Sequence, residues 1–382
     1  MALYSLDNAS AERILLKYYV ERLAPLCTIL KDGNNDFRNV LLPMAIDDPS
    51  LLYALFAYAS VHFSTSSGEP RPSISPLVRL RFETAAARGL SEAIQKNSVS
   101  DSTIACALIC STAEVINGDT EKWYTHLQGA GTLIDQSGGP QRLSKTSDGR
   151  FLLRNFAYHD IMAALTTGSR PRFSHRVYWV EEDGYLSADC LMGVSHEILV
   201  HLSRICNLIA DANECLEQPA AEDIVTRGEG LARDLTNQPL NLSSSPFSSS
   251  ELGYLLHHTE ALRFAGLLHL YRFLGRFVVA ATYEPQMISC VQKILAHVSQ
   301  VPRGYHCEMG LVFPLFMAGV AVAKNEDRGA VSYIRDRLDH LHSWTLFKHV
   351  KRIQEVLEML WCYKRTDWET VVRGLGWRVS MA

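Results

Sequence analysis

The segment FAYHDIMAALTTGSRPRF, residues 156–173, groups the side chains of this chain that are best suited to chemistry. Tyr158, His159 and Asp160 follow one another, and Arg172 comes twelve residues after the aspartate. A phenol, an imidazole and a carboxylate can exchange protons, and a guanidinium can stabilise a developing negative charge. If the chain is an enzyme, these four residues are the catalytic candidates. They would act without a cofactor, on the cyclisation or rearrangement of an apolar metabolite that the protein holds in shape.

Asp160 also has a structural interpretation. On a helical wheel it falls on the same apolar arc as Phe156, where a carboxylate is costly unless a cation or several N–H donors meet it. After this helix the chain turns back through Arg170 and Arg172. We therefore expect Asp160 to form an ion pair with Arg170 or Arg172, or to accept hydrogen bonds from backbone amides of the returning segment.

Two apolar segments could surround an apolar small molecule. In residues 259–277, Gly266 and Gly275 would let neighbouring helices approach closely, and in residues 310–323, Pro314 would kink a helix and expose carbonyl groups. Ordinary core packing is the alternative. Aromatic rings and a flexible methionine suit the wall of an apolar site. The ligand-binding candidates are Phe264, Tyr271, Phe313, Phe316 and Met317.

The sequence shows no pattern of metal ligands. Its nine cysteines are widely spaced without a CxxC motif, and most of them have apolar neighbours. In SHEILVHLSRIC, His196 and His201 are five residues apart rather than four, so their side chains diverge on a helix. We expect reduced thiols inside the protein, no metal and no cofactor.

Charge and hydropathy exclude some classes of protein. The formal net charge is −4, and the first 60 residues contain five basic against seven acidic side chains. A chain that binds nucleic acid by itself usually displays a concentrated basic face, so direct binding is not expected. Asp7 and Glu12 interrupt any secretory signal, and no apolar run is long enough to cross a membrane.

The elements that position these residues are predicted to be helices almost throughout, because apolar residues recur at spacings of three and four. Asp101 or Ser102 is expected to cap the helix that begins there. Only residues 175–183, HRVYWVEED, alternate as a strand does, and they are predicted to be a loop or a short strand. The predicted helices span residues 10–28, 49–61, 77–96, 101–116, 120–137, 148–167, 193–216, 219–236, 251–282, 284–299, 309–323, 327–341 and 345–363.

Two segments rich in serine and proline, residues 64–76 and 238–250, are predicted to be flexible loops. The composition is the same on both sides of the second segment, although a domain boundary there is an alternative. We predict one large all-α domain over residues 1–382, built from packed antiparallel helix pairs in a bundle like an α-α superhelix.

The order of four segments resembles the fungal-specific transcription factor effector domain, the regulatory region of zinc binuclear cluster regulators. They are YYVERLAPLCTIL with the following NVLLPMAIDDPSLLYALFAYASVHF, the HLxGAxxLI motif at residues 126–134, the YHD helix around Asp160, and ALRFAGLLHLYRFL. The resemblance implies an all-α fold, a nuclear regulatory role, homodimerisation and, in some members, an apolar small-molecule pocket in the C-terminal half.

The zinc cluster and its basic linker are missing from this sequence. The chain is then either an excised regulatory region or a protein that begins at Met1 and needs a DNA-binding partner. The first hypothesis is a nuclear regulator of a metabolic or secondary-metabolite pathway, acting through ligand sensing and protein contacts without direct DNA contact. The second is the cofactor-independent enzyme, which would be cytoplasmic. The absence of a recognisable catalytic constellation from the sequence favours the first.

Overall fold

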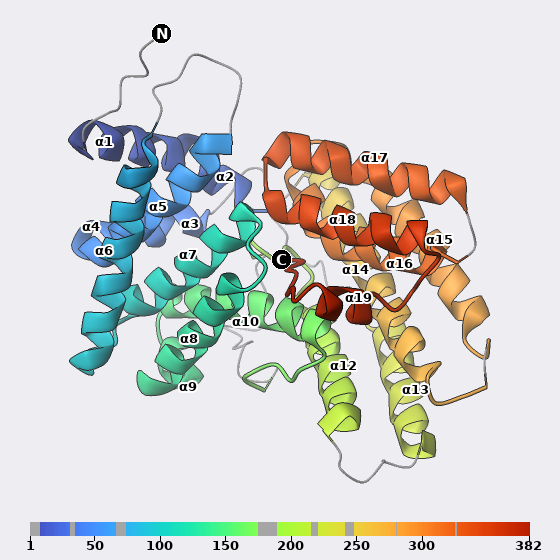
Figure 1. The fold of residues 1–382 in the computed structure, drawn as a ribbon. Helices are drawn as coiled ribbons and strands as arrows, with labels where there is room; N and C mark the ends of the chain where they lie inside the picture. The colour runs from blue at the N-terminus through green and yellow to red at the C-terminus, as the bar shows by residue number, and fades with distance from the viewer. Residues whose placement is uncertain are drawn as a thin grey trace. The chain divides into compact units, whose positions relative to one another are not determined.

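The computed structural model describes residues 8–30, 35–65, 74–174, 189–214, 221–240, 248–279, 281–324 and 327–382. Within these ranges the fold is all-α, as predicted, and the only β pairing is an isolated bridge between Asp189 and Gly193 (Figure 1). The alternating run 175–183 and most of the two predicted loops lie outside the described residues. No helix in the described part is both long and apolar enough to cross a membrane.

The chain divides into two compact units. Unit 1 comprises residues 1–156 and 345–349, and unit 2 comprises residues 157–344 and 350–382. Helix α10 (Ser147–Thr167) begins in unit 1 and ends in unit 2. The single domain over residues 1–382 stays a prediction.

Unit 1 is built around α5 (Pro49–Thr65), which packs against the helices before and after it. Asp48 begins this helix as a cap, because its Oδ1 accepts the amides of Ser50 at 2.8 Å and Leu51 at 3.3 Å. The other elements are α1 (Asn8–Tyr18), η1 (Tyr19–Leu23), α2 (Ala24–Leu26), α3 (Asp36–Asn39), α4 (Leu41–Asp47), α6 (Pro76–Gln95), α7 (Asp101–Asn117), α8 (Lys122–Gln136) and α9 (Pro140–Leu143).

The helix predicted over residues 10–28 is confirmed over residues 8–26, which are helical without a gap and contain the π-helical turn η1 two residues before Pro25. One local prediction for unit 1 was wrong. The cap of α7 is Ser100, not Asp101 or Ser102. Ser100 Oγ accepts the amide of Thr103 and Thr103 Oγ1 accepts the amide of Ser100, both at 3.2 Å, which forms a capping box.

The core of unit 1 consists of aromatic and aliphatic side chains. The ring of Phe37 meets that of Phe151 edge to face with centroids 5.5 Å apart, and Tyr18 meets Phe63 in the same way at 5.0 Å. The buried His62 is satisfied within this unit by the hydroxyl of Tyr18 at 2.8 Å and the carbonyl of Thr345 at 2.6 Å.

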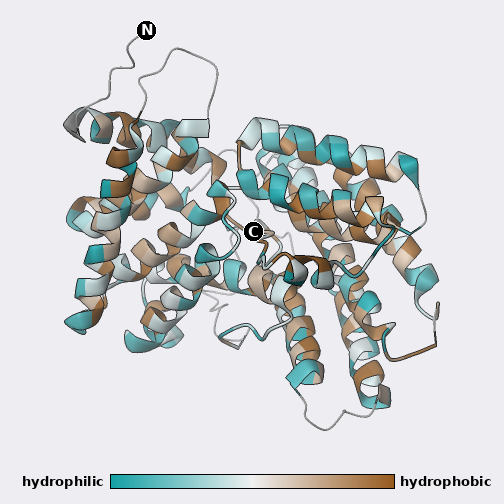
Figure 2. Cartoon of the chain, in the orientation of Figure 1, coloured by the Kyte–Doolittle hydropathy of each residue, from teal (hydrophilic) through white to brown (hydrophobic). Residues whose placement is uncertain are grey.

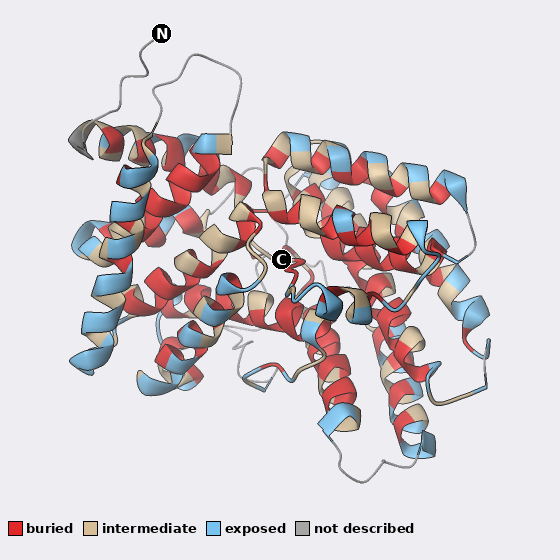
Figure 3. Cartoon of the chain, viewed as in Figure 1, coloured by how far each residue is buried: buried red, intermediate tan, exposed pale blue. Residues whose placement is uncertain are grey.

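Unit 2 is built around α14 (Ser249–Leu274), which packs against α12, α13, α15 and α16. Gly266 permits the close approach of α12, as predicted, because a Cβ there would lie 2.4 Å from Leu202 Cδ2. Hydrophilic residues are frequent on α17 in Figure 2, and Figure 3 marks several of them as exposed. The other elements are α12 (His196–Glu214), α13 (Ala221–Asn237), α15 (Glu284–Gln300), the 3-10 helix η2 (His306–Leu311), α16 (Val312–Val322), α17 (Arg328–Thr345), α18 (Lys348–Cys362) and α19 (Trp368–Gly374).

Two further predictions were wrong in unit 2. Gly275 is the C-cap of α14 rather than a site of close helix approach, since the atoms nearest to a Cβ there belong to its own helix end. Pro314 does not kink a helix. It lies in the first turn of α16, directly after η2, where backbone N–H groups have no acceptor within the helix and a proline is therefore tolerated.

Candidate functional site

Asp160 lies at the C-terminal half of α10 with only 3% of its surface exposed. The backbone amide of Arg172 donates a hydrogen bond of 2.6 Å to its Oδ2, so the carboxylate holds the returning segment through the main chain. The guanidinium of Arg170 contacts two acids of α12, Asp211 at 2.8 Å and Glu214 at 3.0 Å. The ion pair between Asp160 and one of these arginines stays a prediction.

The other two catalytic candidates adjoin Asp160. The rings of Tyr158 and His159 meet edge to face with centroids 5.4 Å apart. Burial lowers the pKa of His159 from 6.5 to about 4 and raises the pKa of Tyr158 from 10.0 to about 12. At neutral pH the imidazole is therefore neutral and the phenol is protonated. General acid–base catalysis works best with a pKa near the working pH, so neither value favours the enzyme hypothesis.

The five ligand-binding candidates fall into two sets. Phe313, Phe316 and Met317 are buried on α16, and the ring of Phe316 meets that of Trp368 edge to face at 5.3 Å. The other set is half-buried on α14. Here Phe264 stacks on His297 with centroids 5.8 Å apart, and Tyr271 stacks on Tyr283 at 5.5 Å. The two helices pack against each other, but the sets have different ring partners.

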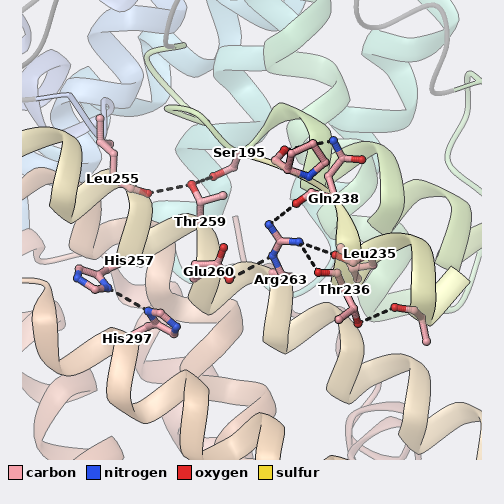
Figure 4. A network of polar contacts seen from close by, with 12 residues as sticks. Ser195, Leu235, Thr236, Gln238, Leu255, His257, Thr259, Glu260, Arg263 and His297 are labelled. Carbon is pink, nitrogen blue, oxygen red and sulfur yellow. Dashed lines mark hydrogen bonds and ion pairs between the residues drawn. The ribbon is translucent and has the colours of Figure 1, made fainter. Parts of the chain in front are cut away.

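A buried arginine that the sequence reasoning missed joins α14 to the end of α13 (Figure 4). Arg263 is 5% exposed, and its Nη1 donates to the carbonyls of Leu235 at 2.6 Å and Thr236 at 3.2 Å. Its Nη2 donates to the carbonyl of Gln238 at 2.8 Å, and its Nε lies 3.2 Å from Glu260 Oε2. The last carbonyls of a helix lack intrahelical donors and carry partial negative charge. Arg263 therefore satisfies the C-terminus of α13.

A buried hydroxyl–imidazole group joins the same helix to Ser195, the residue before α12. Ser195 Oγ is 2.8 Å from Thr259 Oγ1, and Thr259 donates to the carbonyl of Leu255 at 2.8 Å (Figure 4). Ser195 Oγ also lies 3.4 Å from His258 Nδ1. Burial lowers the pKa of His258 to about 4, although a hydrogen bond to the backbone of Gly310 opposes the shift. Its imidazole is neutral at pH 7.

Gly310 allows His258 to occupy this place. A Cβ on Gly310 would lie 2.1 Å from His258 Nε2, which is closer than real Cβ contacts come. The backbone just before α16 therefore lies directly on the imidazole, and α16 carries three of the ligand-binding candidates.

A buried ion pair joins α17 to the segment before α16. Glu308 is 0% exposed and Arg337 is 4% exposed, with Arg337 Nη2 2.7 Å from Glu308 Oε1. The amide of Gly304 donates to Glu308 Oε2 at 2.6 Å, and Arg337 donates to the carbonyl of Val301 at 3.2 Å. Burial raises the pKa of Glu308, and Arg337 opposes that shift.

His257 and His297 form a half-buried pair between α14 and α15, with their Nδ1 atoms 3.0 Å apart (Figure 4). Burial lowers the pKa of His297, and neighbouring His257 and Lys293 lower it further while Glu260 opposes them. In the described ranges, no three His, Cys, Asp or Glu side chains are arranged to hold a metal ion.

The amino-acid sequence is similar to those of known proteins. Residues 14–382 match the model of a family described as the fungal specific transcription factor domain. The chain is 23% identical over 386 aligned residues to the "Uncharacterized transcriptional regulatory protein C965.10" of Schizosaccharomyces pombe, an alignment that covers 95% of this chain and 70% of that protein. It is 22% identical over 358 residues to the "Transcriptional activator protein UGA3" of Saccharomyces cerevisiae, covering 81% of this chain and 65% of that protein. No solved structure matches it.

Proposed function

The chain belongs to the fungal specific transcription factor domain family, and from this membership we propose that it regulates a metabolic or secondary-metabolite pathway by sensing a small molecule. Membership itself makes the chain a domain of a transcriptional regulator, which implies a nuclear protein. The chain spans about two thirds of the relatives that it matches. Ligand sensing, the partner and the absence of direct DNA contact belong to the proposal.

The polar interior of unit 2 is the observation that carries ligand sensing. Buried charges such as Arg263, Glu308 and Arg337 stabilise a fold less than well-packed apolar side chains of similar size do. Unit 1 has no buried Asp, Glu, Lys or Arg among its described residues, so such groups are not a requirement of helix packing in this protein. Their confinement to unit 2, among the described residues, supports a role beyond packing.

The proposed ligand is apolar with a polar group. Phe316 and Met317 on α16 would contact the apolar body of the ligand. Phe264 and Tyr271 on α14 would contact another side of the ligand. The hydroxyl of Ser195 would meet its polar group. Aromatic and thioether side chains repack around a guest at small cost, which suits a site that opens to admit a ligand.

Contacts with other proteins would link ligand binding to transcription of the target genes. A net charge of −4 argues against the concentrated basic surface that binds DNA, so a DNA-binding partner protein or a homodimer is the proposed route. The small molecule would change which protein surfaces the domain offers.

Native mass spectrometry of the full chain purified from fungal cells tests the ligand. We expect a mass excess that unfolding releases, and we expect Phe316→Leu to reduce the bound fraction. Phe151→Leu in unit 1 is the matched control, because Phe151 is also buried and also meets another ring edge to face. Either change should lower stability by about 1 kcal/mol. A chain without a bound molecule, or equal loss of it in both variants, would contradict ligand sensing in unit 2.

A tethering assay tests the regulatory role separately. The full chain is joined to an unrelated DNA-binding domain, and a reporter is measured in a fungal host grown on different carbon and nitrogen sources. The proposal predicts reporter output that changes with the nutrient. Output equal to that of the bare DNA-binding domain on every nutrient would refute it.

A further inference from the structure

Helix α6 of unit 1 has an apolar face that no other described element covers. Its inward side chains Val78 and Phe82 are 7% and 2% exposed. On the outward side, Leu77 is 69% exposed, Leu80 55% and Ile94 50%, and Figure 3 marks α6 largely as exposed. Three large aliphatic side chains in water on a single helix are an unusual concentration, because exposed hydrophobic residues are normally scattered singly.

The exposed positions follow the spacing of a helix–helix seam. The spacing between successive positions alternates between three and four residues, which is the repeat by which one helix packs along another. The middle of the seam carries small side chains, which leave room for larger side chains of a second helix between the bulky ends. The seam comprises Leu77, Leu80, Thr84, Ala87, Ser91 and Ile94, all of them exposed.

The flank of this seam is basic. Arg81 and Arg88 are exposed and follow the seam positions Leu80 and Ala87. The two carboxylates of α6 are engaged along their own helix: Glu83 lies 2.6 Å from Arg79 Nε, and Glu92 lies 3.3 Å from Lys96 Nζ. Among the described residues, no carboxylate lies within ion-pair distance of Arg88.

We propose that the outward face of α6 binds an amphipathic helix of another protein, with large apolar residues along one stripe and acidic residues beside it. The apolar stripe would cover Leu77, Leu80 and Ile94, and the acidic residues would pair with Arg88. This interaction surface is independent of a small molecule in unit 2.

A second copy of α6 fits the same face less well. In an antiparallel pair of seams, flanking positions of the same kind meet, so Arg88 and Arg81 of the two copies would repel each other. In a parallel pair, Arg88 would meet Glu83 of the other copy, which is already bound to Arg79. The small residues at the centre would also face each other and bury little apolar surface.

Fluorescence anisotropy with the full chain tests the proposal. The probe is a synthetic helical peptide of three heptads with leucine along the seam and glutamate at both flanks, and the matched peptide has lysine for each glutamate. We expect the acidic peptide to bind about tenfold more tightly than the basic one. We expect Leu80→Asp to abolish binding and Arg88→Glu to weaken the acidic peptide about fivefold while favouring the basic one.

Ile288→Asp is the control, since Ile288 is likewise an exposed aliphatic residue on a helix, but on α15 of unit 2. It should leave peptide binding unchanged. Leu80 is exposed, so circular dichroism should show both variants folded. Equal affinity for the two peptides, or equal loss in both variants, would overturn the proposal. So would sedimentation that shows self-association of the chain abolished by Leu80→Asp, because a second copy would then be the occupant.

Discussion

Unit 1 and unit 2 are both helical, but they differ in what they bury. The five buried Asp, Glu and Arg side chains in the described ranges all belong to unit 2: Asp160, Asp189, Arg263, Glu308 and Arg337. The core of unit 1 is made of rings and aliphatic chains, with a few hydroxyl, amide and imidazole groups. Apolar packing tolerates small changes of shape, whereas a buried charge requires its partner in place. Unit 2 should therefore be the more sensitive of the two to pH, to polar substitutions and to ligands.

Acidification should show the largest difference. Burial holds the pKa of His159, His258 and His269 in unit 2 at about 4, below the ordinary 6.5. A lowered folded-state pKa gives stability that is present above pH 6.5 and is lost as pH falls towards 4. Between pH 7 and pH 5, each of these three histidines lowers the free energy of unfolding of unit 2 by about 2 kcal/mol.

Hydrogen exchange at the two pH values, corrected for intrinsic rates, measures this difference unit by unit. The pKa of His62 in unit 1 is lowered in the same direction, by burial and in spite of its bond to Thr345. Carboxylates such as Asp339, whose pKa is lowered below 3.8 chiefly by Lys351, stay charged across this window. Faster exchange in unit 1 than in unit 2 at pH 5 would contradict the prediction that unit 2 is the more sensitive to pH.

Removing one half of the Glu308–Arg337 pair should be the next largest effect. Arg337→Met removes the guanidinium from the buried carboxylate of Glu308, leaves only His340 Nδ1 at 3.5 Å as a possible cation within ion-pair distance among the described residues, and should destabilise unit 2 by about 4 kcal/mol in urea unfolding. The double variant with Glu308→Leu should recover most of the loss, because it removes the second charge as well. An additive loss in the double variant would show that the pair is not the source of the effect.

Asp160→Ala should cost less, about 2 kcal/mol, because it leaves the amide of Arg172 without its buried acceptor. Thermal unfolding of the full chain measures it. Ser111→Ala in unit 1, which removes a 2.7 Å hydrogen bond to the carbonyl of Trp123, is the matched polar change and should cost about 1 kcal/mol. An Asp160→Ala variant that unfolds at the same temperature as the wild type would contradict the structural role of Asp160.

The smallest predicted effect lies at a helix end in unit 1. Ser100→Ala removes one half of the capping box of α7 and should destabilise unit 1 by about 1 kcal/mol, without changing exchange in unit 2. Ser100→Asp should restore most of the stability because aspartate is also a good cap. An equal loss of stability in both units would mean that they unfold together.

The helices were predictable because their signals are local. The apolar spacing and the flanking caps and breaks gave α7, α10 and α15 to within two residues. Errors arose where neighbouring signals compete, as at Ser100, where three consecutive polar residues could each have capped α7. Pro25 was also visible, but the π turn before it depends on packing.

The site was only half visible in the sequence. Asp160 could be recognised as a buried carboxylate because it lies on an apolar arc of its own helix, yet sequence could not choose between a side chain and a backbone amide as its donor. Arg263 offered the same clue, a charge inside an apolar helix, which the sequence reasoning did not use. Glu308 and Arg337 gave none, because they meet only through tertiary packing.

Hydrogen exchange of the chain purified from fungal cells, before and after removal of the small molecule that we propose it binds, tests the difference between the units most directly. We predict that removal speeds exchange in α14 and α16 of unit 2 and leaves α5 and α7 of unit 1 unchanged. Identical exchange in the two preparations, or a change confined to unit 1, would contradict the assignment of ligand sensing to the polar interior of unit 2.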